Sequence, residues 1–116
     1  MKICHVINSL SGGGAETHLL DLVHAQKDQG HTVTVIATGP DKKNMKSLEE
    51  EFTNVSDSVL RLYFPRLFNF YSYIKFYKNL QEKQYDIVHT HQPRSDFMFF
   101  ILKSFTAINV TWIVSI

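Results

Sequence analysis

The sequence has little of several features that would narrow its class at once. It contains a single cysteine, Cys4, so it cannot form an internal disulfide, and we interpret Cys4 as a buried, inert thiol. Its 12 basic and 11 acidic residues nearly cancel, which argues against a nucleic-acid partner. Its longest apolar run, Phe97 to Leu102, is far too short to cross a bilayer.

The N-terminus also lacks the continuous apolar segment of a signal peptide, because His5, Asn8 and Ser9 interrupt it. We therefore expect a cytoplasmic protein. The 116 residues are enough for one domain with its own core, and a composition of 44% hydrophobic and 20% charged residues is ordinary for a globular chain.

Short apolar runs alternate with amphipathic stretches along the whole chain. Runs rich in Ile and Val predict buried strands, and apolar residues repeated every three or four positions predict helices. This alternation predicts a single α/β domain with a doubly wound, Rossmann-like parallel sheet. We expect strands at 2–8, 31–38, 55–63, 85–91 and 108–116, and helices at 15–29, 45–52, 67–83 and 95–104.

The first expected strand-to-helix turn contains Gly12, Gly13 and Gly14. These glycines could let a ligand approach the backbone beside a helix N-terminus, or could serve a tight turn with positive φ, and the spacing favours neither. The turn has neither the P-loop pattern nor the dinucleotide fingerprint. Glu16 falls in the first helical turn, where a carboxylate interacts favourably with the helix dipole, so local grounds favour a structural role.

A second motif, at residues 86–96, reads DIVHTHQPRSD. His89 and His91 lie two apart on an expected strand and therefore point to the same face. Two imidazoles could bind a metal, but no third ligand has convincing spacing, so we expect no metal site. We expect His91, at the carboxyl end of the strand, to line a cleft, and His89 to be a hydrogen-bonded core residue.

The polar residues after this strand have two interpretations each. Ser95 and Asp96 are typical of an N-cap pair for the helix that follows. Arg94, just before them, could contact an anionic ligand or could remain a solvated loop residue.

The expected helix at 67–83 is unusually aromatic. Two interpretations stay open: it packs on the sheet with a few exposed aromatics, or it contacts a second domain, another subunit or the membrane interface. A membrane contact would place the protein at the inner face of the membrane. The helical wheel assigns Leu67, Phe70, Tyr71, Ile74 and Tyr77 to the core face and leaves Phe68, Tyr73 and Phe76 partly outside it.

As a set, the opening KICHVINSLSGGGAETHLLDLVHAQKDQGHTVTVIATGP and the later YDIVHTHQPRSD resemble the N-terminal half of family-4 glycosyltransferases of the GT-B architecture. The resemblance covers essentially all 116 residues. It implies a metal-independent, retaining enzyme without a cofactor, of the kind used in polysaccharide biosynthesis. Such enzymes transfer a sugar from a nucleotide-sugar donor to a glycan, lipid-linked or small-molecule acceptor.

The resemblance also implies roles for the two motifs, although the catalytic residues stay unassigned. The loop of Gly12, Gly13 and Gly14, with Glu16, would face the donor pyrophosphate and the transferred sugar. The histidine-bearing strand end would line the cleft between two domains. The residues that map onto that strand end and its acceptor contacts are Asp86, His89, His91, Gln92, Arg94, Ser95 and Asp96.

The sequence departs from the family pattern in two ways. The fifth strand of the family usually ends in a T-x-H-like pattern whose histidine faces the reaction centre, whereas this chain reads IVSI up to Ile116. Residues 1–116 also contain no segment that resembles the C-terminal donor-binding domain of the family. We therefore expect residues 1–116 to form one acceptor-side domain that is inactive alone and works with a missing domain or a partner chain. The alternative is a non-catalytic binding or scaffold module that acts through a partner chain.

Overall fold

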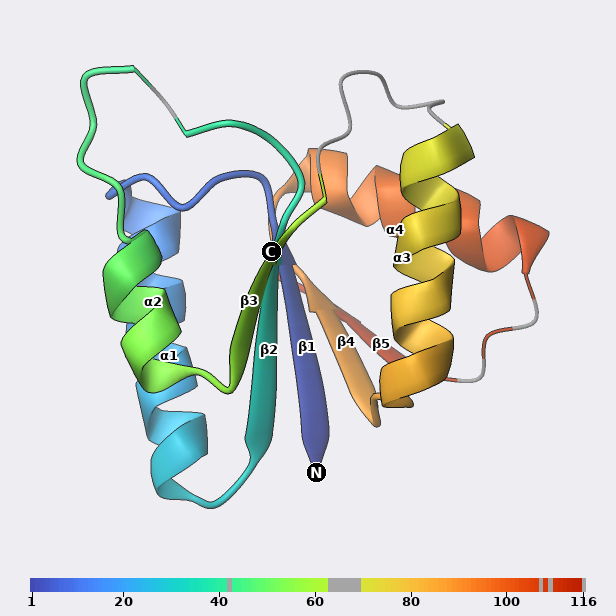
Figure 1. Cartoon of the computed structure of the whole chain (residues 1–116), viewed down its shortest axis with the longest axis horizontal. Coiled ribbons are helices and arrows are strands. Elements are labelled where there is room, and N and C mark those ends of the chain that lie inside the picture. The colour runs from blue at the N-terminus through green and yellow to red at the C-terminus, as the bar shows by residue number, and fades with distance from the viewer. Residues whose placement is uncertain (42, 63–69, 107, 109, 116) are drawn as a thin grey trace.

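The computed structural model describes residues 1–41, 43–62, 70–106, 108 and 110–115. Strands and helices alternate along this part of the chain in the predicted order (Figure 1). The strands are β1 (Lys2–Ile7), β2 (Thr32–Ala37), β3 (Ser58–Arg61), β4 (Ile87–Thr90) and β5 (Thr111–Val114). The helices are α1 (Gly14–Asp28), α2 (Glu49–Val55), α3 (Phe70–Lys83) and α4 (Pro93–Phe105).

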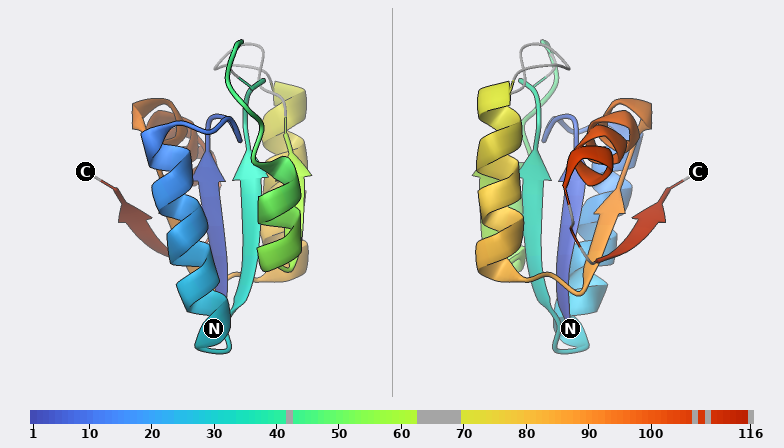
Figure 2. Two further views of the ribbon diagram at one scale, coloured as in Figure 1. Left: turned by 90° about the vertical axis from the view of Figure 1, so that its left-hand side faces the viewer. Right: turned by 90° about the vertical axis from the view of Figure 1, so that its right-hand side faces the viewer.

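The strands form one parallel sheet in the order β3-β2-β1-β4-β5. Helices α1 and α2 cover one face of this sheet, and α3 and α4 cover the other (Figures 1 and 2). The predicted doubly wound, Rossmann-like α/β fold is therefore confirmed. Because the chain builds outward from β1 in one direction and then returns to add β4 on the other side, the topological switch point lies between β1 and β4.

Helices α2 and α4 begin two or more residues away from their predicted starts. Helix α2 begins at Glu49 rather than near Met45, because the residues before it pair with the glycine loop: Ser47 forms an antiparallel bridge with Ser11. Helix α4 begins at Pro93. Proline lacks a backbone N–H, but this costs nothing in the first turn, where that N–H would have no partner within the helix. The predictions for residues 63–69 and 116 lie outside the described residues.

Apolar clusters on the two faces of the sheet hold the helices in place. Strands β1 and β2 are buried on both faces, as is usual for the centre of a parallel sheet, and Cys4 is buried as predicted. The cluster under α1 and α2 contains Ile7, Leu10, Leu19, Val23, Val33, Val35, Ala37 and Phe52. The cluster under α3 and α4 contains Cys4, Val6, Ile36, Tyr73, Phe76, Leu80, Tyr85, Val88, Met98, Phe99 and Leu102.

Helix α3 packs on the sheet with a different face from the one predicted. Tyr73 and Phe76 are buried, and the Phe76 ring lies 6.0 Å from that of Phe99 on α4. Phe70 and Tyr71, which the helical wheel assigned to the core, are 81% and 66% exposed. Aromatic residues lie on both faces of this helix, so periodicity alone could not select the buried one. Among the described residues, no helix is both long and apolar enough to span a membrane.

Candidate functional site

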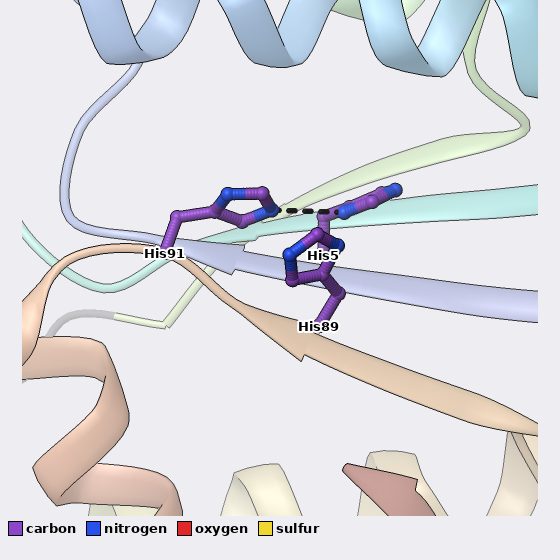
Figure 3. A group of neighbouring side chains, drawn as sticks. All are labelled: His5, His89 and His91. Atoms are coloured by element: carbon purple, nitrogen blue, oxygen red, sulfur yellow. Dashed lines mark hydrogen bonds between the residues drawn. The ribbon is translucent and has the colours of Figure 1, made fainter. Parts of the chain in front are cut away.

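Three histidines meet on one face of the sheet, where β1 and β4 lie side by side (Figure 3). His5 of β1 is the direct partner of His89 of β4 in the parallel register, and His91 follows at the end of β4. Their rings lie between these two strands and α1 (Figure 3). One ring nitrogen from each histidine lies within 4.8 Å of the corresponding nitrogens of the other two. The H-x-H spacing predicted the shared face of His89 and His91, but not the addition of His5.

A continuous chain of hydrogen bonds joins these rings to two other elements. Nε2 of His5 lies 2.7 Å from Oε1 of Gln26 on α1, and its Nδ1 lies 3.0 Å from Nε2 of His91. Oγ of Ser115, the residue that follows β5, lies 3.1 Å from Nδ1 of His91 and 2.6 Å from Nε2 of His89. The cluster is thus tied to β1, β4, α1 and the end of β5.

The amide oxygen of Gln26 sets the direction of this chain, because it can only accept. His5 donates from Nε2, so its Nδ1 accepts from Nε2–H of His91. Nδ1 of His91 then accepts from the Ser115 hydroxyl, whose oxygen accepts from Nε2–H of His89. All three rings are neutral in this arrangement. Nδ1 of His89 is left as an acceptor, and it makes no hydrogen bond to the described residues.

Burial keeps the histidine cluster uncharged. His5 and His91 are 0% and 6% exposed. Loss of water lowers the pKa of His5 to about 4 and that of His91 to about 3, and neighbouring histidines add to both effects. The half-buried His89 also has a lowered pKa because of desolvation, which the negative charge of Asp96 opposes.

The predicted order of burial of the two strand histidines is reversed in the structure, although His89 is hydrogen-bonded as predicted. His91 is buried, and His89 is the more accessible of the two. The reason is helix α1, which covers the end of β4: its His18 lies close enough to contribute to the lowered pKa of His91. Position along the strand could not show which histidine this helix would cover.

The glycine loop fits closely against its own chain. The Gly12 amide donates to the Lys46 carbonyl at 2.6 Å, and a Cβ at Gly12 would lie 3.2 Å from that oxygen. Gly14 has open space where a Cβ would be. Among the described glycines only Gly30 has positive φ, so the predicted alternative of a positive-φ turn is wrong for this loop. The need for glycine at Gly12 comes from close backbone approach instead.

Glu16 lies behind the glycine loop and is 1% exposed. Its Oε2 would be 3.0 Å from a Cβ placed on Gly13, which is the N-cap of α1. This places the carboxylate in the first turn of α1, near the positive end of the helix dipole. This position agrees with the structural role that local grounds favour.

The junction between β4 and α4 is held to the end of β1. Oε1 of Gln92 accepts from the Asn8 amide at 3.1 Å, and the Ser95 hydroxyl donates to Oδ1 of Asn8 at 2.8 Å. Gln92 has a φ of 79°, an uncommon conformation for a residue with a side chain, and it is the N-cap of α4. The predicted N-cap pair is therefore wrong, because Ser95 and Asp96 lie inside the first turn of the helix. Arg94, in the same turn, is exposed.

Asp86 does not join this site. It directly precedes β4, at the amino ends of the strands, where its Oδ2 accepts from the Lys2 amide at 2.7 Å. Its proposed place beside His89 and His91 is therefore wrong, because the length of β4 separates it from the carboxyl edge.

Sequence reasoning also missed residues that complete the site. A histidine inside an apolar strand was the available signal for His5, since a buried imidazole needs a partner. Asn8, Gln26 and Ser115 carried no comparable signal, because their contacts join segments far apart in the sequence.

The doubly wound sheet, with polar residues gathered at the switch point between β1 and β4, is typical of a Rossmann-like domain. The family model for Glycosyltransferase Family 4 matches residues 12–113, and the chain therefore belongs to that family. The sequence resemblance is thus confirmed. No curated protein sequence matches the chain.

The structure is also similar to that of a larger protein, the "lipopolysaccharide outer core galactosyltransferase WaaB apo form", with a TM-score of 0.69 and 15% sequence identity. The match covers 98% of this chain and 32% of that one, so this chain spans about a third of its length. At this identity the likeness shows the fold, which is half of a GT-B architecture.

Proposed function

We propose that this chain is the acceptor-side domain of a glycosyltransferase that moves a sugar from a nucleotide-sugar donor to an acceptor. One observation carries the proposal: the glycine loop and the histidine cluster both lie at the carboxyl ends of β1 and β4, the strands that flank the switch point. Open α/β sheets bind their ligands at this place. Family membership supports the same reaction class.

The donor pyrophosphate would approach the start of α1 at Gly14. The amides of Gly12 and Gly13 already donate to carbonyls of Lys46 and Ser11, whereas the first amides of a helix have no intrahelical partner. Open space at Gly14 lets a ligand reach this backbone. The negative charge of Glu16 beside Gly13 disfavours a phosphate there, so the pyrophosphate belongs over Gly14.

The acceptor would enter beside His89, the most accessible of the three histidines. Its Nδ1 can accept a hydrogen bond from a sugar hydroxyl, and Asp96 on the first turn of α4 lies near enough for its charge to act on His89. Arg94 lies in the same turn and would contact an anionic group of the acceptor. Gln92 and Ser95 would act by holding this turn against Asn8. We further propose that transfer needs no metal or cofactor, retains configuration and requires the second domain of a longer enzyme.

The test is nuclear magnetic resonance titration of the chain with nucleotide sugars and simple acceptor sugars. We expect weak donor binding, with shifts at Gly14, and acceptor shifts near His89. Gly14→Ala should keep the fold, since its Cβ meets no atom, and should remove the donor shifts. His24→Ala, at an exposed site further along α1, should not. Micromolar donor affinity would contradict the claim that the second domain supplies most donor contacts.

A second candidate function is a non-catalytic binding module. An apolar groove of about 400 Å³ lies between α3 and α4, and Phe70 and Phe105 at its rim are 81% and 85% exposed. Such a groove fits a partner chain or a membrane interface. Sedimentation of the purified chain with and without lipid vesicles tests this, and a stable monomer that ignores vesicles counts against it.

A further inference from the structure

We propose that His5, His89 and His91 form a binding site for a divalent transition-metal ion such as Zn²⁺, with three imidazole ligands and one open position. This site goes beyond the proposed sugar transfer, which needs no metal. An ion on Nδ1 of His89 would exclude the acceptor hydroxyl proposed to bind that atom, so the metal-bound and acceptor-bound states are alternatives. Three nitrogen donors suit zinc, cobalt, nickel and copper, and do not suit magnesium or calcium, which prefer oxygen.

The spacing of the rings is close to that of a metal site. Zinc binds imidazole nitrogen at about 2.0–2.1 Å, which places tetrahedral ligands roughly 3.3 Å apart. Nδ1 of His5 and Nε2 of His91 are already 3.0 Å apart, and one nitrogen of His89 lies within 4.8 Å of a nitrogen on each of the other rings. The ring of the half-buried His89, which lies 4.1 Å from that of His91, would have to move toward the other two nitrogens to complete the set.

The far side of each ring is held by an oxygen atom. Gln26 holds Nε2 of His5, and Ser115 holds Nε2 of His89 and Nδ1 of His91. Metal-binding histidines typically have such a partner on the second nitrogen, which fixes both the ring orientation and the tautomer. The cluster has this outer set of contacts before any ion arrives.

Binding requires one change of tautomer. In the metal-free chain Nε2 of His91 carries the proton that it donates to His5. When the ion takes this nitrogen, the proton moves to Nδ1, and the Ser115 oxygen then accepts from both His91 and His89. The three rings gain and lose no proton in total. Their lone pairs on Nδ1 of His5, Nδ1 of His89 and Nε2 of His91 then face the ion.

The surroundings favour a cation at this point. Asp96 lies on the first turn of α4, soon after the end of β4 that carries His89 and His91, and its Oδ1 is buried without a hydrogen bond to the described residues. His89 is only partly buried, which leaves a route for the ion and for a water ligand. Cys4 lies on the opposite face of β1, in the cluster under α3 and α4, and cannot take part.

The experiment is calorimetric titration of the untagged, metal-free chain with Zn²⁺ at neutral pH. We expect one ion per chain and a raised melting temperature. His89→Gln and His91→Gln should each lower the affinity at least about tenfold, and Ser115→Ala should lower it about tenfold through the lost outer contact. The double control variant His24→Gln/His31→Gln, which changes histidines outside the cluster, should bind like the unsubstituted chain.

Two further measurements keep the test decisive if a buried substitution unfolds the chain. The absorption of bound Co²⁺ should show four-coordinate nitrogen and oxygen ligation without a thiolate band. Nitrogen-15 shifts of His91 should show its proton move from Nε2 to Nδ1 on binding. Absence of one-to-one binding up to about 1 mM Zn²⁺ would overturn the proposal. So would binding that the His24→Gln/His31→Gln variant abolishes and His89→Gln retains. Neither result would touch the proposed transfer reaction.

Discussion

Strands β1 and β4 show two different faces to the helices that cover them. Toward α3 and α4 they present Cys4, Val6 and Val88, which are fully buried among apolar side chains. Toward α1 they present His5 and His89, which are hydrogen-bonded. The apolar side chains need no hydrogen-bond partners when they are buried. The buried imidazoles on the other face do need them, because burying a polar group without a hydrogen bond costs free energy. The same two strands thus carry apolar packing on one face and the candidate functional site on the other.

The largest effect should come from the apolar face. Phe76→Ala removes a fully buried ring and should lower the free energy of unfolding by about 3–5 kcal/mol. Phe70→Ala on the same helix removes an exposed ring and should change it by less than about 0.5 kcal/mol. Chemical denaturation measures both. Equal losses would mean that α3 does not pack as described.

Mild acid should act on the polar face alone. The pKa of His5, about 4, and that of His91, about 3, lie below the value of about 6.5 for histidine in an unfolded chain. At a pH between the folded and unfolded pKa values, the unfolded chain therefore binds more protons than the folded chain. Stability is therefore full above about pH 6.5 and falls as the pH drops. At about pH 5.5 the two rings together should remove about 3 kcal/mol.

Denaturation midpoints measured from about pH 8 down to about pH 5 check this loss. Two aspartates do not obscure the result. The pKa of Asp41 is lowered because Arg61 and the Leu10 amide donate to it, and the pKa of Asp57 is lowered because Lys27 and the Val33 amide donate to it. Both carboxylates therefore stay ionised in this pH range. A flat profile would show that the histidines are not buried as neutral rings.

Removal of the Gln26 oxygen should have a smaller effect. Gln26→Leu leaves Nε2–H of the buried His5 without its acceptor, which should cost about 1–3 kcal/mol. It should also release the tautomer of His5, which nitrogen-15 shifts can detect. The exposed Gln29→Leu makes the same chemical change without a buried partner and should be nearly neutral. Equal effects of the two substitutions would contradict the fixed direction of the hydrogen-bond chain.

The smallest effects should come from the glycine loop at the carboxyl edge. Gly12→Ala brings a Cβ within 3.2 Å of the Lys46 carbonyl oxygen and should cost about 1 kcal/mol. Gly14→Ala meets no neighbouring atom and should be neutral or stabilise by up to about 1 kcal/mol. Thermal melting of the two variants tests whether close approach of the chain, rather than φ, explains the glycine at Gly12.

The sequence by itself determined the order of strands and helices, the parallel sheet and the shared face of His89 and His91. These properties follow from local periods of the backbone, two residues in a strand and 3.6 in a helix, which a single segment records. Family membership was also visible in the sequence, from the glycine-containing strand-to-helix segment near the N-terminus and the histidine-bearing strand of residues 86–96.

Only the tertiary structure decided what those segments meet. The register of β1 against β4 brought His5 to His89, and the packing of α1 supplied Gln26 and buried His91. The close approach of the segment around Lys46 gave the glycine loop its shape. Packing also selected which aromatic face of α3 became core, since both faces are apolar enough to serve. Contacts between distant segments depend on register and crossover geometry, which local periodicity does not encode.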